Sequence, residues 1–200
     1  MEEPEKMDNV IVLYPGSYKP VHSGHISLIF RHLNQPDVRC LKLLIGPGNR
    51  DGITQEIAFD IVDLLLKDDS RILIEKVSYP SPVLTAFKYI ETADPSTYAL
   101  ASANKDNDYE RVERFCRQHK EGGKYHDNVP EGVNFTVIPI DVCPITYVGR
   151  SDEKNGTEIS GRILRQDVKN DDFNNFKTNY LGIDDHKILN IWDILKECIR

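Results

Sequence analysis

The chain has 200 residues, of which 40% are hydrophobic, and its formal net charge is −7 at pH 7. This length suits one domain with a sizeable core, and the acidic balance argues against a general nucleic-acid-binding protein. No apolar run approaches the length of a membrane helix, and the first residues lack a secretory signal pattern, so we expect a cytoplasmic protein without a membrane partner. The cysteines are scattered without a CxxC pair, which disfavours a zinc site.

Short apolar runs alternate with helical patterns along the chain. The runs predict strands at residues 10–13, 38–45, 71–77, 98–101 and 135–140. Apolar residues at helical spacing predict helices between these runs, and further helices follow residue 160. Because strands that alternate with helices form parallel crossover units, we predict an α/β fold with a Rossmann-like, doubly wound parallel sheet.

The same patterns predict how the chain is divided. We expect residues 1–9 to form a flexible N-terminal tail and residues 10–180 to form the main domain. Residues 181–200 are expected to form a short C-terminal helical extension that packs on this domain.

The junction between the first strand and the first helix carries the strongest chemical signal. It reads Tyr14-Pro-Gly-Ser-Tyr-Lys-Pro-Val-His-Ser-Gly-His25. Gly16 allows the backbone to turn sharply or to approach a ligand closely. His22 and His25 lie three residues apart where a helix begins, so both rings can project toward one point. Free backbone N–H groups and the positive end of the helix dipole also meet there, which favours a phosphate group.

A second stretch, Glu158-Ile-Ser-Gly-Arg-Ile-Leu-Arg165, indicates another phosphate contact. Ser160 can begin a helix, and its hydroxyl and the amides of the first turn can donate to phosphate oxygens. Arg165 adds a charge-assisted hydrogen bond from the same helix.

These two stretches resemble the nucleotidyltransferase superfamily that carries the (H/T)xGH signature. Gly16-Ser-Tyr-Lys-Pro20 resembles the lead-in G-[ST]-[FY]-x-P, and His22-Ser-Gly-His25 matches HxGH. The second stretch resembles the C-terminal ISSTxxR or ISGTxxR element of the family, except that Arg162 stands where Ser or Thr is usual. The resemblance covers about residues 10 to 180.

The resemblance implies that an acceptor phosphate attacks the α-phosphorus of a nucleoside triphosphate and that pyrophosphate leaves. It implies catalytic contacts from His22, His25 and Arg165. Lys42 and Arg50 are expected to hold the acceptor, because the loop after the second strand looks like that of phage and microbial members. The expected nucleotide-binding residues come from both stretches and from the loop after the fourth strand: Gly16, Ser17, Tyr18, Lys19, Gly24, Ser102, Asp106, Ser160, Gly161 and Arg162.

The substrates and the metal follow from the same resemblance. We expect ATP as the nucleotide, a small phosphorylated acceptor, and a Mg²⁺ ion that bridges phosphates. No carboxylate cluster identifies ligands for this ion, so we assign no protein residue to it. We expect no nucleic-acid partner.

Several alternatives stay open at this point. Pro20 resembles the GSFNP and GTFDP loops of mononucleotide and phosphopantetheine adenylyltransferases, so we favour adenylyl transfer, with nicotinamide mononucleotide preferred to phosphopantetheine as acceptor. His22 keeps a CTP-dependent cytidylyltransferase as the alternative, since those enzymes often carry HxGH. Arg162 and the sparse metal ligands leave open a non-catalytic nucleotide-binding regulatory module. The last helix is a packing surface or the contact of a homo-oligomer.

Overall fold

The structure is a computed structural model that describes residues 9–101, 108–138 and 145–199. Its strands form one sheet in the order β3-β2-β1-β4-β5, and each strand is parallel to its neighbours. The strands are β1 (Val10–Gly16), β2 (Val38–Ile45), β3 (Ile72–Lys76), β4 (Thr97–Leu100) and β5 (Asn134–Phe135). The helices are α1 (Ser23–Leu33), α2 (Gln55–Leu66), α3 (Pro82–Ile90), α4 (Asp108–His119), the 3₁₀ helix η1 (His126–Asn128), α5 (Gly161–Lys169), α6 (Phe173–Lys177) and α7 (Asp185–Cys198). The predicted Rossmann-like parallel sheet is therefore confirmed.

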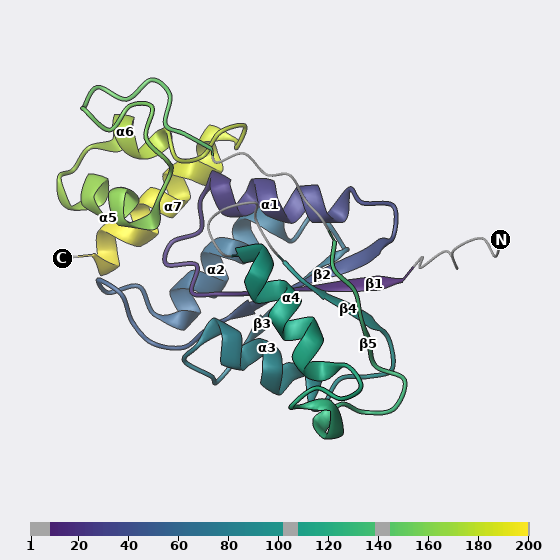
Figure 1. The fold of residues 1–200 in the computed structure, drawn as a ribbon. Coiled ribbons are helices and arrows are strands. Elements are labelled where there is room, and N and C mark those ends of the chain that lie inside the picture. The colour runs from purple at the N-terminus through teal and green to yellow at the C-terminus, as the bar shows by residue number, and fades with distance from the viewer. Residues whose placement is uncertain (1–8, 102–107, 139–144, 200) are drawn as a thin grey trace.

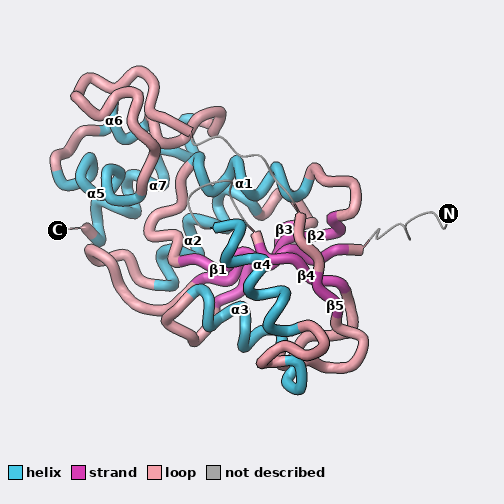
Figure 2. The backbone as a smooth tube through the Cα atoms, viewed as in Figure 1, coloured by secondary structure: helices cyan, strands magenta, loops and turns pink. Residues whose placement is uncertain are grey.

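Helices cover both faces of the sheet. Figure 1 shows α1, α2 and the C-terminal helices α5, α6 and α7 on one side and α3 and α4 on the other. Figure 2 shows the strands gathered at the centre of the molecule with the helices around them. This arrangement has the three layers that a doubly wound α/β fold requires.

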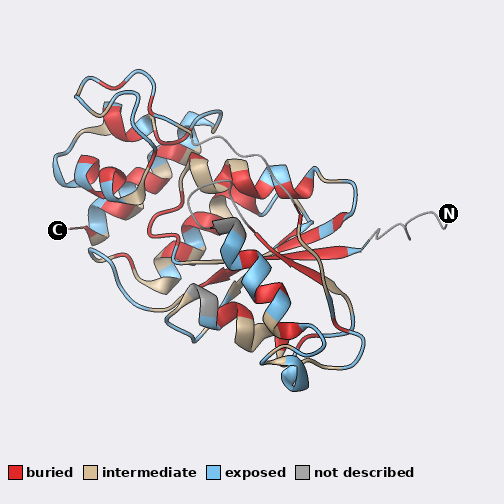
Figure 3. Cartoon of the chain, viewed as in Figure 1, coloured by how far each residue is buried: buried red, intermediate tan, exposed pale blue. Residues whose placement is uncertain are grey.

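The central strand β1 is buried because both of its faces are covered. Val10 and Val12 belong to the larger hydrophobic core, under α1 and α2, whereas Ile11 and Leu13 belong to the smaller core, under α3 and α4. Figure 3 shows that buried residues line the strands and the sheet-facing sides of the helices. The unbroken apolar run of β1 is thus explained by a parallel strand that has no exposed face.

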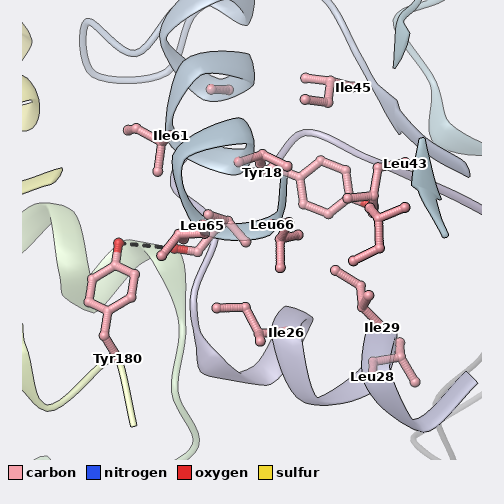
Figure 4. Close-up of a cluster of buried hydrophobic side chains, with 14 of the residues drawn as sticks. Tyr18, Ile26, Leu28, Ile29, Leu43, Ile45, Ile61, Leu65, Leu66 and Tyr180 are labelled. Atoms are coloured by element: carbon pink, nitrogen blue, oxygen red, sulfur yellow. Dashed lines mark hydrogen bonds between the residues drawn. The ribbon is translucent and has the colours of Figure 1, made fainter. Parts of the chain in front are cut away.

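The larger core extends to the loop that follows β1. Figure 4 shows Tyr18 of this loop in one cluster with Ile29 of α1 and Leu43 of β2. At the edge of the cluster, the Tyr180 hydroxyl donates to the Val21 carbonyl over 3.1 Å. The core therefore fixes the position of the loop that carries the first sequence stretch.

The strand order changes direction at β1, which pairs with β2 on one side and with β4 on the other. Ligands of open α/β sheets bind beyond the carboxyl ends of the strands at such a switch point. Gly16, the last residue of β1, begins the loop at this point.

One strand is markedly shorter than the sequence predicts. The strand predicted at residues 135–140 is the shorter β5, and residues 139 and 140 lie outside the described part of the chain. β5 is an edge strand that pairs with β4 alone, so fewer hydrogen bonds maintain it.

Among the described helices, none is both long enough and apolar enough to cross a membrane.

Candidate active site

A cleft of about 450 Å³ lies beside the loop that joins β1 to α1. Its walls come from this loop, from the turn after β2, and from the start of α5. The lining residues are Ser17, Tyr18, Lys19, Pro20, His22, His25, Arg50, Glu158, Ile159, Ser160, Gly161, Arg162 and Arg165. The two stretches that stood out in the sequence therefore meet in space, together with Arg50.

His22 and His25 lie against each other at the start of α1. Their ring centroids are 3.9 Å apart and their planes are tilted by 40°. The Nδ1 atom of each ring is buried and has no hydrogen-bond partner among the described residues. Burial lowers the pKa of His25 to about 4, and burial together with the neighbouring His25 lowers the pKa of His22 to about 2. Both imidazoles are neutral at pH 7, and each then keeps one N–H donor.

Two glycines shape the wall around these rings. A Cβ atom on Gly24 would lie 3.1 Å from Cε1 and Nδ1 of His22, so a side chain there would displace the imidazole. A Cβ atom on Gly16 would lie 2.9 Å from Cζ of Tyr18, whose ring in turn packs edge-on against His25 at 5.3 Å. Gly16 and Gly24, expected to bind the nucleotide, contribute here by making room for the side chains that line the cleft.

Tyr18 and Lys19 line the cleft, but their polar atoms are used to fix the loop. The Tyr18 hydroxyl donates to the Tyr14 carbonyl over 2.6 Å. The Lys19 ammonium is buried and donates to the carbonyls of Gly46 and Pro47 over 3.1 and 2.9 Å. Lys19 therefore ties the loop after β1 to the loop after β2, which places both loops on one cleft.

The N-termini of α1 and α5 have no side-chain cap. His22 and Ser160 occupy the N-cap positions with extended backbones, and neither side chain accepts a hydrogen bond from its helix. Among the described residues, no acceptor reaches the amides of Gly24 in α1 or of Gly161 and Arg162 in α5. These amides are the donors that a bound anion can satisfy.

Three arginines bring positive charge to the cleft, but their partners differ. Arg165 is buried, and it donates to the carboxylate of Asp51 and to two backbone carbonyls. Arg50 and Arg162 are exposed, and within the described part of the chain neither side chain makes a hydrogen bond or an ion pair. Arg50 and Arg162 therefore remain available to an anionic ligand.

Lys42 is a predicted site residue that does not line the cleft. Lys42, expected to hold the acceptor, lies in the middle of β2 on the face covered by α3. Its Nζ atom lies 3.2 Å from the Glu75 carboxylate and donates to the Tyr89 hydroxyl. Because side chains alternate along a strand, Lys42 points to the smaller core's face and not toward the loop that follows. Ser102 and Asp106 lie outside the described residues.

Sequence reasoning missed a buried network behind α5. Both terminal nitrogens of Arg150 donate to the Asp167 carboxylate of α5, each over 2.8 Å, and Nε donates to Asp152 over 2.9 Å. The guanidinium also lies 4.6 Å from the centre of the Tyr147 ring. This network holds the segment before α5 against the helix. Arg150 and Asp167 are 17 residues apart in the sequence and each reads as a solvated charge, so no pattern indicates their pairing.

Metal-ligating side chains are sparse. The described residues contain no group of three or more His, Cys, Asp or Glu that could hold a metal ion. Glu158 is the one carboxylate among the described residues that line the cleft. These side chains do not form a cage for a resident Mg²⁺ ion, which prefers six oxygen ligands.

Comparison with known proteins identifies a curated relative and similar solved structures. No family model matches the chain. The phosphopantetheine adenylyltransferase of Clostridium kluyveri is 27% identical over 66 residues, which make up 33% of this chain and 40% of that relative. The match thus spans less than half of the relative's length.

Two solved structures are similar at lower identity. One is a bifunctional NMN adenylyltransferase/ADP ribose pyrophosphatase of Francisella tularensis, with 13% identity and a TM-score of 0.48 over 96% of this chain and 52% of that one. The other is the nicotinic acid mononucleotide adenylyltransferase of Plasmodium falciparum, with 14% identity and a TM-score of 0.44 over 93% of this chain and 98% of that one. The resemblance predicted from the motifs is confirmed at the level of the superfamily: the chain is similar to an adenylyltransferase.

Proposed function

We propose that the chain is a nucleotidyltransferase that moves the adenylyl group of ATP onto a small phosphorylated acceptor and releases pyrophosphate. One observation carries the proposal: two uncapped helix N-termini lie at a single cleft with two imidazole rings, whose Nδ1 atoms have no hydrogen-bond partner among the described residues. Free amides, neutral N–H donors and exposed arginines together form a site for a polyphosphate. The similarity to a phosphopantetheine adenylyltransferase supports the same reaction class.

The reaction needs positioning and charge stabilisation more than covalent chemistry. An oxygen of the acceptor phosphate forms a bond to the α-phosphorus of ATP, and the bond from this phosphorus to the bridging oxygen breaks. The electron pair leaves with pyrophosphate, so no covalent enzyme intermediate is required. Aligning the two substrates and stabilising the charge that moves to the leaving group supply the acceleration.

The neutral state of the histidines suits this task. A partly buried, neutral imidazole is placed against the triphosphate at little electrostatic cost, and its N–H can donate to a phosphate oxygen. As negative charge develops in the transition state, this hydrogen bond strengthens, which selectively stabilises the transition state. We assign this role to His25 and His22, and assign the leaving pyrophosphate to Ser160, Arg162 and Arg165.

A divalent cation enters this scheme with the substrate. Because the described side chains form no metal cage, MgATP is the form of the nucleotide that we propose, with phosphates and water supplying most of the coordination. The ion would offset the charge of the phosphate oxygens when bound.

The acceptor side is assigned to the turn after β2. Arg50 is an exposed cation on this turn and has no partner within the described part of the chain. We propose that it holds the acceptor phosphate. Nicotinamide mononucleotide is our first choice of acceptor and phosphopantetheine, suggested by the name of the curated relative, is the second.

A matrix of substrates tests the function. Each of the four nucleoside triphosphates is incubated with Mg²⁺ and with nicotinamide mononucleotide, phosphopantetheine or glycerol 3-phosphate, and pyrophosphate release and product mass are measured. Release from ATP with one acceptor is the expected result. Release from CTP alone would identify a cytidylyltransferase instead. Nucleotide binding without release from any pair would contradict catalysis and favour a regulatory module.

A further inference from the structure

The side chain of Asp51 joins the acceptor side of the cleft to the helix on the triphosphate side. Asp51 follows Arg50 in the turn after β2, yet its Oδ2 atom lies 2.7 Å from Nε of Arg165, which belongs to α5. Its Oδ1 atom lies 2.7 Å from Nζ of Lys169, one helical turn further along α5. The carboxylate thus contacts two cations of the same helix.

Three hydrogen bonds orient the guanidinium group of Arg165. Nε donates to Asp51, and Nη1 donates to the carbonyls of Lys19 and Gly161 over 2.7 and 2.9 Å. Nη2 has no partner among the described residues, and Arg165 lines the cleft. Because the guanidinium is planar and rigid, fixing Nε and Nη1 also fixes the direction in which Nη2 points.

The turn that carries Asp51 is itself held in place. Arg50 and Ile53 form an antiparallel bridge in which each amide donates to the other's carbonyl over 3.1 Å. Gly52 has a φ of +87°, and a Cβ atom there would lie 1.9 Å from the carbonyl oxygen of Cys198 at the end of α7. A side chain at this position is excluded, so the turn lies directly against the backbone of α7. Asp51 therefore reaches Arg165 from a fixed position.

We propose that Asp51 is a positioning residue that keeps Arg165 directed at the triphosphate, a role that rests on the proposed function. Asp51 does not contact the reacting atoms. It acts through Arg165. Because Arg50 precedes Asp51 in the same turn, this contact also links the acceptor side of the cleft to α5.

Removing the Asp51 carboxylate should change anion affinity in opposite directions for a positioning role and for simple electrostatic repulsion. A carboxylate near a phosphate site repels the ligand, so removing it from a site that stays intact should strengthen anion binding. If Asp51 positions Arg165, removing the carboxylate should weaken anion binding, because Arg165 loses the partner that orients it.

The test measures binding of inorganic tripolyphosphate by calorimetry, which needs no acceptor. Asp51 has a φ of +52°, so Asp51→Gly removes the carboxylate at a backbone conformation that glycine adopts freely. Asp51→Asn removes the charge and tolerates the same conformation. We expect the glycine variant to bind tripolyphosphate about tenfold more weakly, and the asparagine variant to lose less, since its amide oxygen can still accept from Nε.

Asp171 provides the matched control. It also has a positive φ, of +58°, and its carboxylate lies 2.7 Å from Nζ of Lys196. Asp171→Gly therefore removes one carboxylate and one surface ion pair at a left-handed position away from the cleft. Its affinity for tripolyphosphate should equal that of the parent protein.

A double-mutant cycle distinguishes positioning from a general loss of structure. In an Arg165→Ala background, Asp51→Gly should cause no further weakening, because there is no guanidinium left to orient. Equal or tighter binding by Asp51→Gly in the parent background would overturn the role of Asp51. Failure of the parent protein to bind either tripolyphosphate or ATP would instead contradict the proposed function. Thermal unfolding of each variant confirms that the folded protein is being measured.

Discussion

The N-termini of α1 and α5 meet the same cleft in different ways. At α1, the side chains that face the cleft are His22 and His25, which are partly buried and neutral. At α5 they are the exposed Arg162 and the buried Arg165, which carry permanent charge. A neutral donor responds to charge that develops during a reaction, whereas a fixed cation attracts a polyphosphate before the reaction begins. The difference indicates that α1 acts mainly in the chemical step and α5 mainly in binding.

Four helices that do not border the cleft have side-chain caps at their N-termini. Side chains cap the N-termini of α2, α3, α6 and α7, through Thr54, Ser81, Asp172 and Asp184. Each of these helices satisfies one or more of its first-turn amides within the protein. Among the described α-helices whose N-caps are assigned, the two without a side-chain cap are therefore the two that border the cleft.

Replacement of His25 should give the largest effect. In His25→Ala, kcat should fall by about 10² to 10³, the usual loss when a transition-state donor is removed, while ATP binding changes little. Steady-state kinetics and calorimetric titration with ATP measure the two effects. The matched control is His186→Ala, which removes an exposed histidine from α7. An unchanged kcat in a folded His25→Ala protein would contradict the role of α1 in the chemical step.

Changes on α5 should act on binding. Arg165→Ala should weaken ATP binding about ten- to hundredfold, as expected for a lost charge-assisted hydrogen bond, and turnover should slow as well. Arg162→Thr restores the residue usual in the family and should retain much of the activity. Arg162→Glu should abolish activity, because it places a like charge beside the phosphates. If Arg162→Glu matches the parent protein, Arg162 points to solvent and the phosphates depend on Ser160 and Arg165 alone.

The low pKa values of the histidines predict an acid-sensitive fold. The folded protein holds His25 neutral down to about pH 4, whereas the unfolded chain protonates it near pH 6.5. The unfolded state therefore binds more protons in this window, and stability falls as the pH is lowered from about 6.5 toward 4. Between pH 7 and pH 4.5, His25→Gln should lose about 2 kcal/mol less unfolding free energy than the parent protein. Urea denaturation at both pH values gives the comparison, and equal losses would show that His25 is not held neutral.

Arg50 and Lys42 form a matched pair for the acceptor. Arg50→Ala should raise the acceptor KM about tenfold, because it removes an exposed cation from the cleft, and should leave ATP affinity almost unchanged. Lys42→Met should leave the acceptor KM unchanged and should lower the unfolding free energy by about 1 kcal/mol, since Glu75 and Tyr89 lose their partner. A raised acceptor KM in Lys42→Met would show that Lys42 does contribute to acceptor binding.

The sequence predicted the sheet and the position of the cleft, because local rules govern both. The apolar run before Gly16 and the helical pattern after His25 are typical of a strand–loop–helix unit, and repetition of that unit predicts a parallel sheet. The two helix starts could be found for the same reason, since a cap position and the spacing of a few residues determine them.

Partners that are distant in sequence could not be predicted. Lys42 looked like a ligand-binding cation, and its placement beside Glu75 and Tyr89 depends on tertiary structure that the sequence does not reveal. Asp51 read as a turn residue, because Asp-Gly is a common turn pair and nothing local points to Arg165. Ion pairs between residues that are distant in sequence depend on tertiary structure, which hydrophobic periodicity and secondary-structure propensity do not predict.

The smallest effects are expected at two N-cap residues, Thr54, which caps α2, and Ser160, which does not cap α5. The Thr54 hydroxyl accepts from the Ile57 amide over 3.3 Å, so Thr54→Ala should lower the unfolding free energy by about 1 kcal/mol. The Ser160 hydroxyl makes no such bond, so Ser160→Ala should change the unfolding free energy by no more than a few tenths of that amount. Ser160→Ala should instead weaken tripolyphosphate binding a few-fold, because the hydroxyl is a donor to the ligand. Urea denaturation and calorimetry on both variants separate these outcomes. If Ser160→Ala destabilises the fold as much as Thr54→Ala does, Ser160 caps α5 in solution, and its first-turn amides are not reserved for an anion.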